Sequence, residues 1–157
     1  MFGRKKEKSK IVASQTGECI AIEMVPDPVF ADKMLGDGVA VIPEENEVKS
    51  PVDGTVVQVF DTLHAYSIES EDGLEILVHI GLNTVELKGQ GFTPKVKEGD
   101  KVRAGDVLCE ADIAFLKEKG YNLHTPIVIT NISQVKKFDV LKGRVIGGET
   151  PVIEYTK

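Results

Sequence analysis

Two histidines are the residues whose type and spacing are best suited to chemistry. His64 lies in one β-forming segment, residues 62–68, and His79 lies near the end of another, residues 74–80. The four residues 70–73 (Ser-Glu-Asp-Gly) between the segments are typical of a hairpin turn. An even-numbered loop would place both imidazoles on one face, directly opposite or diagonal, whereas an odd-numbered loop would place them on opposite faces.

The apolar pattern of the second segment favours an even loop. Alternate residues form its core face, namely Leu74, Ile76, Val78 and Ile80. His79 therefore points to the other face. With an even loop, Leu63 and Ala65 continue the core face on the first segment. Thr62, two residues before His64, then lies on the histidine face.

A histidine pair on an outward face has three interpretations. The first is an incidental hydrogen-bonded pair. The second is a metal site, but two histidines are too few without a third ligand. The third is nucleophilic or acid–base chemistry, in which one imidazole attacks phosphorus while the other and a threonine hydroxyl stabilise charge on phosphoryl oxygens. His124 has no partner that its spacing identifies, and we interpret it as structural or exposed.

The elements that must position this pair are short strands. Apolar runs alternate with turns that contain Gly and Asp, which predicts an all-β, antiparallel β-sandwich or barrel. Two short helices are expected, over residues 28–35 and over residues 113–119 with Asp112 as the N-cap, so fewer than a fifth of the residues are α-helical. Residues 14–22 and 51–59 each place Gly fourth, before alternating β-formers, which indicates a duplicated β unit.

Length and composition limit the class of protein. The 157 residues are 41% apolar and 28% charged, as expected of one globular domain. Five of the first ten residues are basic, and we expect a flexible basic tail over residues 1–10 and a single domain over residues 11–157. The remainder carries 14 bases against 24 acids, which argues against nucleic-acid binding.

The apolar runs of the sequence do not match a membrane helix or a signal peptide. No apolar run reaches the ~18 residues of a membrane helix, and no apolar stretch follows the basic start as it would in a signal peptide. Cys19 and Cys109 are too few and too far apart for a disulfide framework. We therefore expect a cytoplasmic protein without direct membrane insertion.

Several motifs together resemble one known family. They are Val-Pro-Asp-Pro-Val-Phe-Ala at 25–31, Ser-Pro-Val-Asp-Gly-Thr at 50–55, Phe-Asp-Thr-Leu-His-Ala at 60–65, Val-His-Ile-Gly at 78–81, Thr-Val-Glu-Leu-Lys-Gly at 84–89 and Gly-Glu-Thr-Pro-Val-Ile at 148–153. Over about residues 17–157 the chain resembles the glucose-type enzyme IIA of the bacterial phosphoenolpyruvate:sugar phosphotransferase system. The fold that this resemblance implies is an antiparallel β-sandwich of a duplicated hybrid motif with one or two short helices.

The resemblance implies a phosphotransferase component that acts as a phosphocarrier. His79 matches the family's phosphorylated histidine, which accepts a phosphoryl group from phospho-HPr and passes it to a cysteine of a IIB domain of a sugar transporter. His64 matches a second active-site histidine, needed more for onward transfer than for acceptance, and Thr62 matches the hydroxyl that supports it. No cofactor is expected in the isolated chain. In a partner complex, zinc can bridge His64 and His79 to a partner's carboxylate.

The resemblance also assigns an HPr and IIB docking surface around the histidines. Its residues correspond to Asp27, Val29, Phe30, Met34, Leu35, Phe60, Leu77, Gly81, Asn83 and Val85. Some relatives have a second rim acid where this chain has Asn83, so Asp27 alone is left to meet a partner's arginine. We expect Phe30, Phe60 and Val85 to border the two histidines in a shallow depression.

Three other classes of protein share features with this sequence. Residues 96–108 have the paired Gly-Asp turns of a lipoyl or biotinyl carrier, but Ile113 stands where such a carrier has its modified lysine. A zinc metallopeptidase of the LytM type shares this kind of β unit, but its His-x-His pair is absent. The alternative that remains open is a regulatory module of the same family that mainly binds other proteins.

Overall fold

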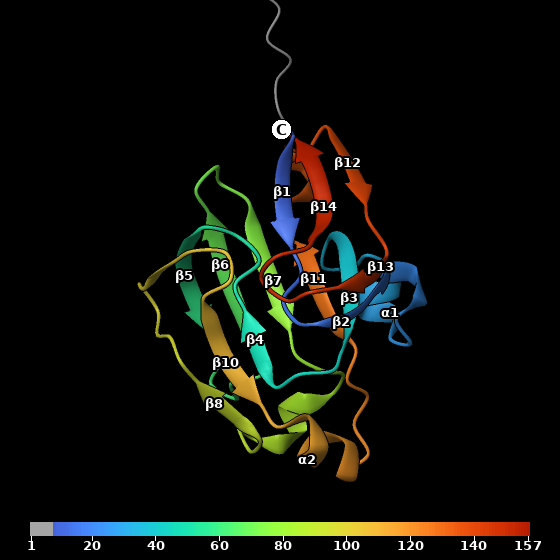
Figure 1. The fold of residues 1–157 in the computed structure, drawn as a ribbon, viewed down its shortest axis with the longest axis vertical. Coiled ribbons are helices and arrows are strands. Elements are labelled where there is room, and N and C mark those ends of the chain that lie inside the picture. The colour runs from blue at the N-terminus through green and yellow to red at the C-terminus, as the bar shows by residue number, and fades with distance from the viewer. Residues whose placement is uncertain (1–7) are drawn as a thin grey trace, which may run out of the picture.

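The computed structural model describes residues 8–157 and consists mainly of antiparallel strands (Figure 1). The largest sheet has eight strands, in the order β13 (Gly143–Val145), β2 (Gly17–Ala21), β3 (Asp37–Pro43), β11 (Thr125–Ile129), β7 (Glu75–His79), β6 (Ala65–Ser70), β5 (Gly54–Val59) and β9 (Lys101–Val102). A second sheet has the order β4 (Glu47–Lys49), β10 (Val107–Ala111) and β8 (Phe92–Pro94). The third has the order β1 (Ser9–Val12), β14 (Pro151–Thr156) and β12 (Lys137–Val140). This architecture confirms the predicted antiparallel β class.

The helices are few and short. The α-helices are α1 (Pro28–Ala31) and α2 (Ile113–Glu118), close to the two predicted, although α1 ends before the predicted Leu35. An aspartate side chain caps the start of each helix, Asp27 in α1 and Asp112 in α2. Three 3₁₀ helices complete the elements of the described residues: η1 (Ile22–Met24), η2 (Thr84–Leu87) and η3 (Ile132–Gln134). Within residues 8–157, no helix has the length and apolar character needed to cross a membrane.

The predicted basic tail can be compared with the structure only at its end. Residues 1–7 of that tail lie outside the described residues. β1 begins at Ser9, where Ser9 pairs with Tyr155 and Lys10 pairs with Glu154 of β14. The ordered sheet therefore starts two residues before the boundary that the sequence predicts.

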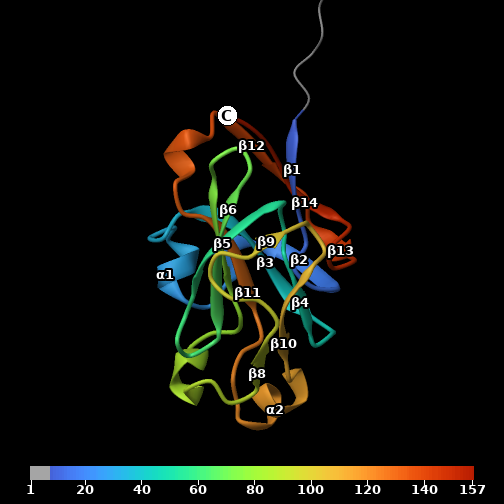
Figure 2. The same ribbon diagram turned by 90° about the vertical axis from the view of Figure 1, so that its left-hand side faces the viewer.

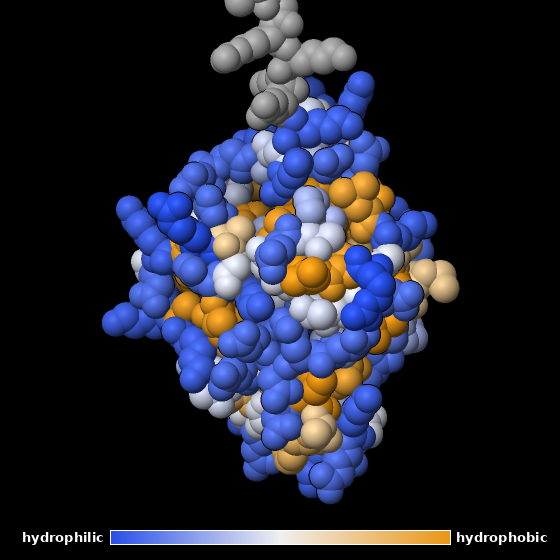
Figure 3. Space-filling view, in the orientation of Figure 1, coloured by the Kyte–Doolittle hydropathy of each residue, from blue (hydrophilic) through white to orange (hydrophobic). Residues whose placement is uncertain are grey.

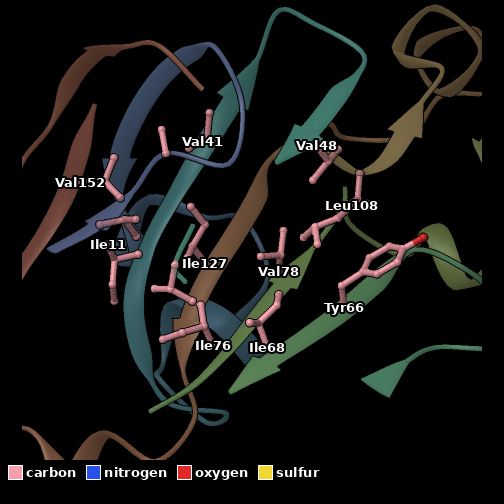
Figure 4. Packing of buried hydrophobic residues seen from close by; sticks show 14 of the residues in the cluster. Ile11, Val41, Val48, Tyr66, Ile68, Ile76, Val78, Leu108, Ile127 and Val152 are labelled. Carbon is pink, nitrogen blue, oxygen red and sulfur yellow. The ribbon is translucent and has the colours of Figure 1, made fainter. Parts of the chain in front are cut away.

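Two hydrophobic clusters occupy opposite faces of the eight-stranded sheet. The main core is the large cluster between this sheet and the two smaller ones. Figure 4 shows Val78 beside Leu108 of β10 and Val48 of β4, with Ile127 and Ile76 farther along the same core. The second cluster lies on the other face and consists of Ile22, Val25, Phe30, Ala40, Ala65, Leu77, Leu82 and Val128. In Figure 2, strands β5 and β11 of this sheet lie between α1 on one side and β10 on the other. Strands of the central sheet thus contribute alternate residues to each cluster.

The sequence repeat corresponds to two equivalent close approaches between strands. β2 and β5 each begin at a glycine, Gly17 and Gly54. A Cβ atom on Gly17 would lie 2.0 Å from the carbonyl oxygen of Ile42, and one on Gly54 would lie 2.1 Å from that of Glu69. Only glycine allows the backbones to come this close, which explains why both copies of the repeat place Gly at the same position.

Candidate functional site

His79 lies at the end of β7, a strand in the interior of the eight-stranded sheet between β11 and β6. Ile76 and Val78 point into the main core, whereas Leu77 belongs to the second cluster. Because side chains alternate along a strand, His79 shares the face of Leu77. The outward direction that the sequence predicts for His79 is confirmed.

The predicted register of the hairpin is wrong. β6 and β7 pair Ala65 with His79 and Tyr66 with Val78. His64 is therefore neither directly opposite His79 nor diagonal to it. The loop has an odd number of residues because Gly73 adopts a left-handed conformation, with φ of 92°, as in a three-residue hairpin loop. The core face of β6 therefore continues with Tyr66, and Ala65 instead packs in the second cluster.

The two imidazoles nevertheless meet, because the chain turns before β6 begins. Leu63 has a φ of 61°, which is rare for a leucine, and its amide donates to the carbonyl of Phe60 at 2.7 Å. The His64 carbonyl accepts from the Ile80 amide at 2.7 Å, which ties the turn to the end of β7. The turn brings the ring centroids of His64 and His79 to 4.9 Å, with the ring planes 85° apart.

Hydrogen bonds orient each ring. Nδ1 of His79 donates to the carbonyl oxygen of Gly81 at 2.8 Å, because a carbonyl can only accept. In the neutral ring, this places the proton on Nδ1 and leaves the lone pair of Nε2 available. Nδ1 of His64 lies 2.7 Å from Oγ1 of Thr62, as expected of a supporting hydroxyl.

The surroundings keep both rings uncharged near neutral pH. Burial, followed by the proximity of His79, lowers the pKa of His64 from its usual 6.5 to about 4. Only 4% of the His64 surface is exposed. Burial also lowers the pKa of His79, although the bond to Gly81 and the negative charge of Asp27 act in the opposite direction. Neutral imidazoles are the form in which a ring nitrogen can act as a nucleophile.

Aromatic rings surround the pair, as expected for two of the three predicted border residues. The ring of Phe30 lies 4.9 Å from that of His79, and the ring of Phe60 lies 5.7 Å from that of His64, centroid to centroid. Phe30 is buried in the second cluster, and Phe60 packs against it. The third residue, Val85, lies in η2 with half of its surface exposed.

The other predicted docking residues fall into exposed and buried groups. Eight large apolar residues of the described chain are exposed, and five of them lie in η1, in η2 or in and just after α1: Met24, Val29, Met34, Leu35 and Val85. Leu77, in contrast, is buried, so like Phe30 it forms the floor of this region. Asn83 is exposed and precedes η2 in a left-handed conformation. The opposite side, with β4 and β10 in front, is mostly hydrophilic with small, separate apolar groups (Figure 3).

The sequence also singles out Asp27, as a docking residue, and His124, as structural or exposed. The Asp27 carboxylate accepts from the Val29 amide at 3.0 Å and so begins α1 beside the histidines. His124 is partly buried, and its Nδ1 contacts Oδ1 of Asn122. Within residues 8–157, no group of three or more His, Cys, Asp or Glu side chains is placed to hold a metal ion.

The sequence does not reveal two residues of the site, Leu63 and Thr84. Leu63 orients His64 through a left-handed backbone, which no residue type other than Gly, Asn or Asp signals in a sequence. Thr84 is completely buried, and its hydroxyl donates to the Ile80 carbonyl at 2.6 Å, next to the residue that accepts from His79. Its only signal was a polar residue within the motif 84–89.

Comparisons with known proteins agree with this geometry. The family model described as phosphoenolpyruvate-dependent sugar phosphotransferase system, EIIA 1, matches residues 9–135. The glucose-specific EIIA component of Oceanobacillus iheyensis is 49% identical over 152 residues, which cover 96% of this chain and 92% of that protein. The corresponding component of Haemophilus influenzae is 45% identical over 160 residues, which cover 100% of this chain and 96% of that protein.

A solved structure shows the same fold. The glucose permease IIA from Mycoplasma capricolum is 38% identical and superimposes with a TM-score of 0.88, covering 98% of both chains. The sequence match and the fold match thus extend over nearly the whole molecule. The chain belongs to the EIIA 1 family of the phosphoenolpyruvate-dependent sugar phosphotransferase system.

Proposed function

We propose that this protein is a phosphocarrier in which His79 accepts a phosphoryl group from phospho-HPr and passes it to a cysteine of a IIB domain. The observation that carries this proposal is the bond from His79 Nδ1 to the Gly81 carbonyl, which leaves Nε2 unprotonated beside a second imidazole. Membership of the EIIA 1 family supports the same role.

Each transfer forms one bond to phosphorus and breaks another. In acceptance, the Nε2 lone pair of His79 attacks phosphorus, a P–N bond forms, and the donor leaves with the electron pair of its bond to phosphorus. In delivery, the cysteine thiolate of the IIB domain attacks the same phosphorus, and the electron pair of the P–N bond returns to Nε2. His79 neither gains nor loses a proton in either step, because the Gly81 carbonyl retains Nδ1–H throughout.

His64 and Thr62 are proposed to stabilise charge on the phosphoryl oxygens. The His64 and His79 rings lie nearly perpendicular to each other, and the Thr62 oxygen lies 2.7 Å from Nδ1 of His64. When the Thr62 oxygen accepts a hydrogen bond from Nδ1–H of His64, the neutral His64 ring has no proton on Nε2. Nε2 then carries a proton only when the ring is cationic. A phosphoryl group adds about two negative charges and favours that cation, which would then balance charge during delivery.

The apolar region around the pair suits partners that bind in turn. The exposed residues Val29, Met34, Leu35 and Val85 form the proposed docking surface, with Phe30, Phe60 and Leu77 beneath them and Asp27, Gly81 and Asn83 at the site itself. An apolar surface of this kind can exclude water from the phosphoryl group while HPr or a IIB domain is bound. A single rim acid, Asp27, is available for an arginine of either partner.

The decisive experiment follows acid-labile phosphate from labelled phosphoenolpyruvate through enzyme I and HPr. His79→Gln is expected to gain no label, because it lacks the nucleophile. His64→Gln is expected to gain label but to deliver it ~10²–10³-fold more slowly to a IIB domain, since a preorganised group that balances charge is lost. His124→Gln is the matched control and is expected to behave as the wild type. Labelling of His79→Gln, or normal delivery by His64→Gln, would show that the roles are assigned wrongly.

A further inference from the structure

The segment Ile80–Leu82, called here the strap, connects β7 to η2 and contains the carbonyl that orients His79. Its first residue is held on both sides: the Ile80 amide donates to the His64 carbonyl at 2.7 Å, and the Ile80 carbonyl accepts from the Thr84 hydroxyl at 2.6 Å. Its last residue donates to the Asn122 carbonyl at 3.0 Å. The strap therefore has a fixed position relative to both histidines.

Thr84 contacts the strap with both branches of its side chain. The hydroxyl makes the bond to Ile80, and a Cβ placed on Gly81 would lie only 2.7 Å from the Thr84 methyl group. Gly81 itself has a φ of 74°, so its carbonyl direction depends on a conformation that side-chain-bearing residues rarely adopt. No part of Thr84 is exposed to solvent. Its hydroxyl thus faces the strap and no external ligand.

We infer that Thr84 is a positioning residue that fixes the tautomer of His79 by holding the Gly81 carbonyl in line with Nδ1. Without the hydroxyl, the buried Ile80 carbonyl loses its donor and the strap loses the tie between its first residue and η2. The Gly81 carbonyl then moves away from Nδ1, and the ring proton divides between Nδ1 and Nε2. A proton on Nε2 occupies the lone pair that attack on phosphorus requires.

The consequence for transfer rests on the proposed function, whereas the consequence for the tautomer does not. The tautomer is measured on the protein alone, by ¹⁵N chemical shifts of its imidazoles near neutral pH. In the wild type, Nδ1 of His79 is expected to resonate as a protonated nitrogen and Nε2 as an unprotonated one. In Thr84→Val, which keeps the shape but removes the donor, the two shifts are expected to move toward each other. Thr84→Ser keeps the hydroxyl and is expected to restore the wild-type pattern.

A matched control separates positioning from stability. Ser50 is also completely buried, and its hydroxyl donates to the Val52 carbonyl at 2.7 Å, between β4 and β5. Ser50→Ala is expected to lower the unfolding temperature as Thr84→Val does, but to leave the His79 shifts unchanged. If Thr84→Val does not fold, Thr84→Cys replaces it, because a thiol is a weaker donor and is expected to shift the pattern part of the way.

The transfer assay completes the test. Thr84→Val is expected to accept phosphoryl from phospho-HPr up to ~10²-fold more slowly, as a misplaced reacting group does, and Thr84→Ser is expected to recover. The inference would be overturned if Thr84→Val kept the wild-type ¹⁵N shifts of His79, or if Ser50→Ala changed those shifts as much as Thr84→Val does. Thr84 would then be a stabilising residue only. If the His79 shifts change in Thr84→Val but the wild-type protein accepts no phosphoryl group, the inference is upheld and the proposed function is refuted.

Discussion

Acidification from pH 7 to pH 5 is expected to destabilise this protein through His64. Burial and His79 lower the pKa of His64 in the folded chain to about 4, whereas the unfolded chain takes up the proton near 6.5. The unfolded state therefore binds more protons between these values, so the stabilisation is complete above about pH 6.5 and is lost as the pH falls toward about 4. From these two pKa values, His64 alone removes about 2 kcal/mol of unfolding free energy between pH 7 and pH 5.

The measurement is urea-induced unfolding of wild type, His64→Gln and His124→Gln at both pH values. His64→Gln is expected to lose about 2 kcal/mol less than the wild type, because glutamine does not titrate. His124→Gln is expected to keep most of the wild-type loss, since burial lowers the pKa of His124 but by less. The pKa of His79 is lowered as well and adds a loss of the same sign. An equal loss of stability in wild type and His64→Gln would refute the reasoning.

Two further substitutions test the surroundings of His79. Asp27→Ala removes both the cap of α1 and a negative charge that raises the pKa of His79, so thermal unfolding should show a loss of about 1 kcal/mol and NMR titration a lower His79 pKa. Asp27→Asn should lower the pKa equally but keep the stability, and identical stability losses in both variants would contradict the capping role. Gly81→Ala should cost about 1–2 kcal/mol in chemical unfolding because of its left-handed backbone, and unchanged stability would show that the strap can relax.

Much of the site follows from alternation along β7. The pattern Leu74, Ile76, Val78, Ile80 fixed one face in the core and therefore directed His79 outward. The turn residues likewise predict the antiparallel architecture, and the short segments after Asp27 and Asp112 predict both α-helices. These features depend on local patterns that a sequence displays directly.

The predicted hairpin register is wrong because it takes Leu63 and Ala65 as the continuation of the core face, whereas Ala65 pairs with His79 and packs in the second cluster. β6 has its own alternation, in which Tyr66 and Ile68 are apolar and Ser67 and Glu69 are polar. Aligning those two apolar residues with the core face of β7 requires the observed pairing of Tyr66 with Val78. The contact between the imidazoles then depends on the backbone of Leu63, which a leucine does not reveal in a sequence.

The place of β7 inside the sheet has a consequence for the thermodynamics of association. β11 and β6 flank the strand that carries His79, and the strap fixes its ring, so little motion of His79 itself is left to freeze when a partner docks. For the proposed carrier, the entropy of ordering the reacting groups would therefore fall mainly on the partner side of each encounter. Rapid exchange between a donor and an acceptor then requires a small contact area on this side, because a rigid surface of larger area would hold its first partner too long.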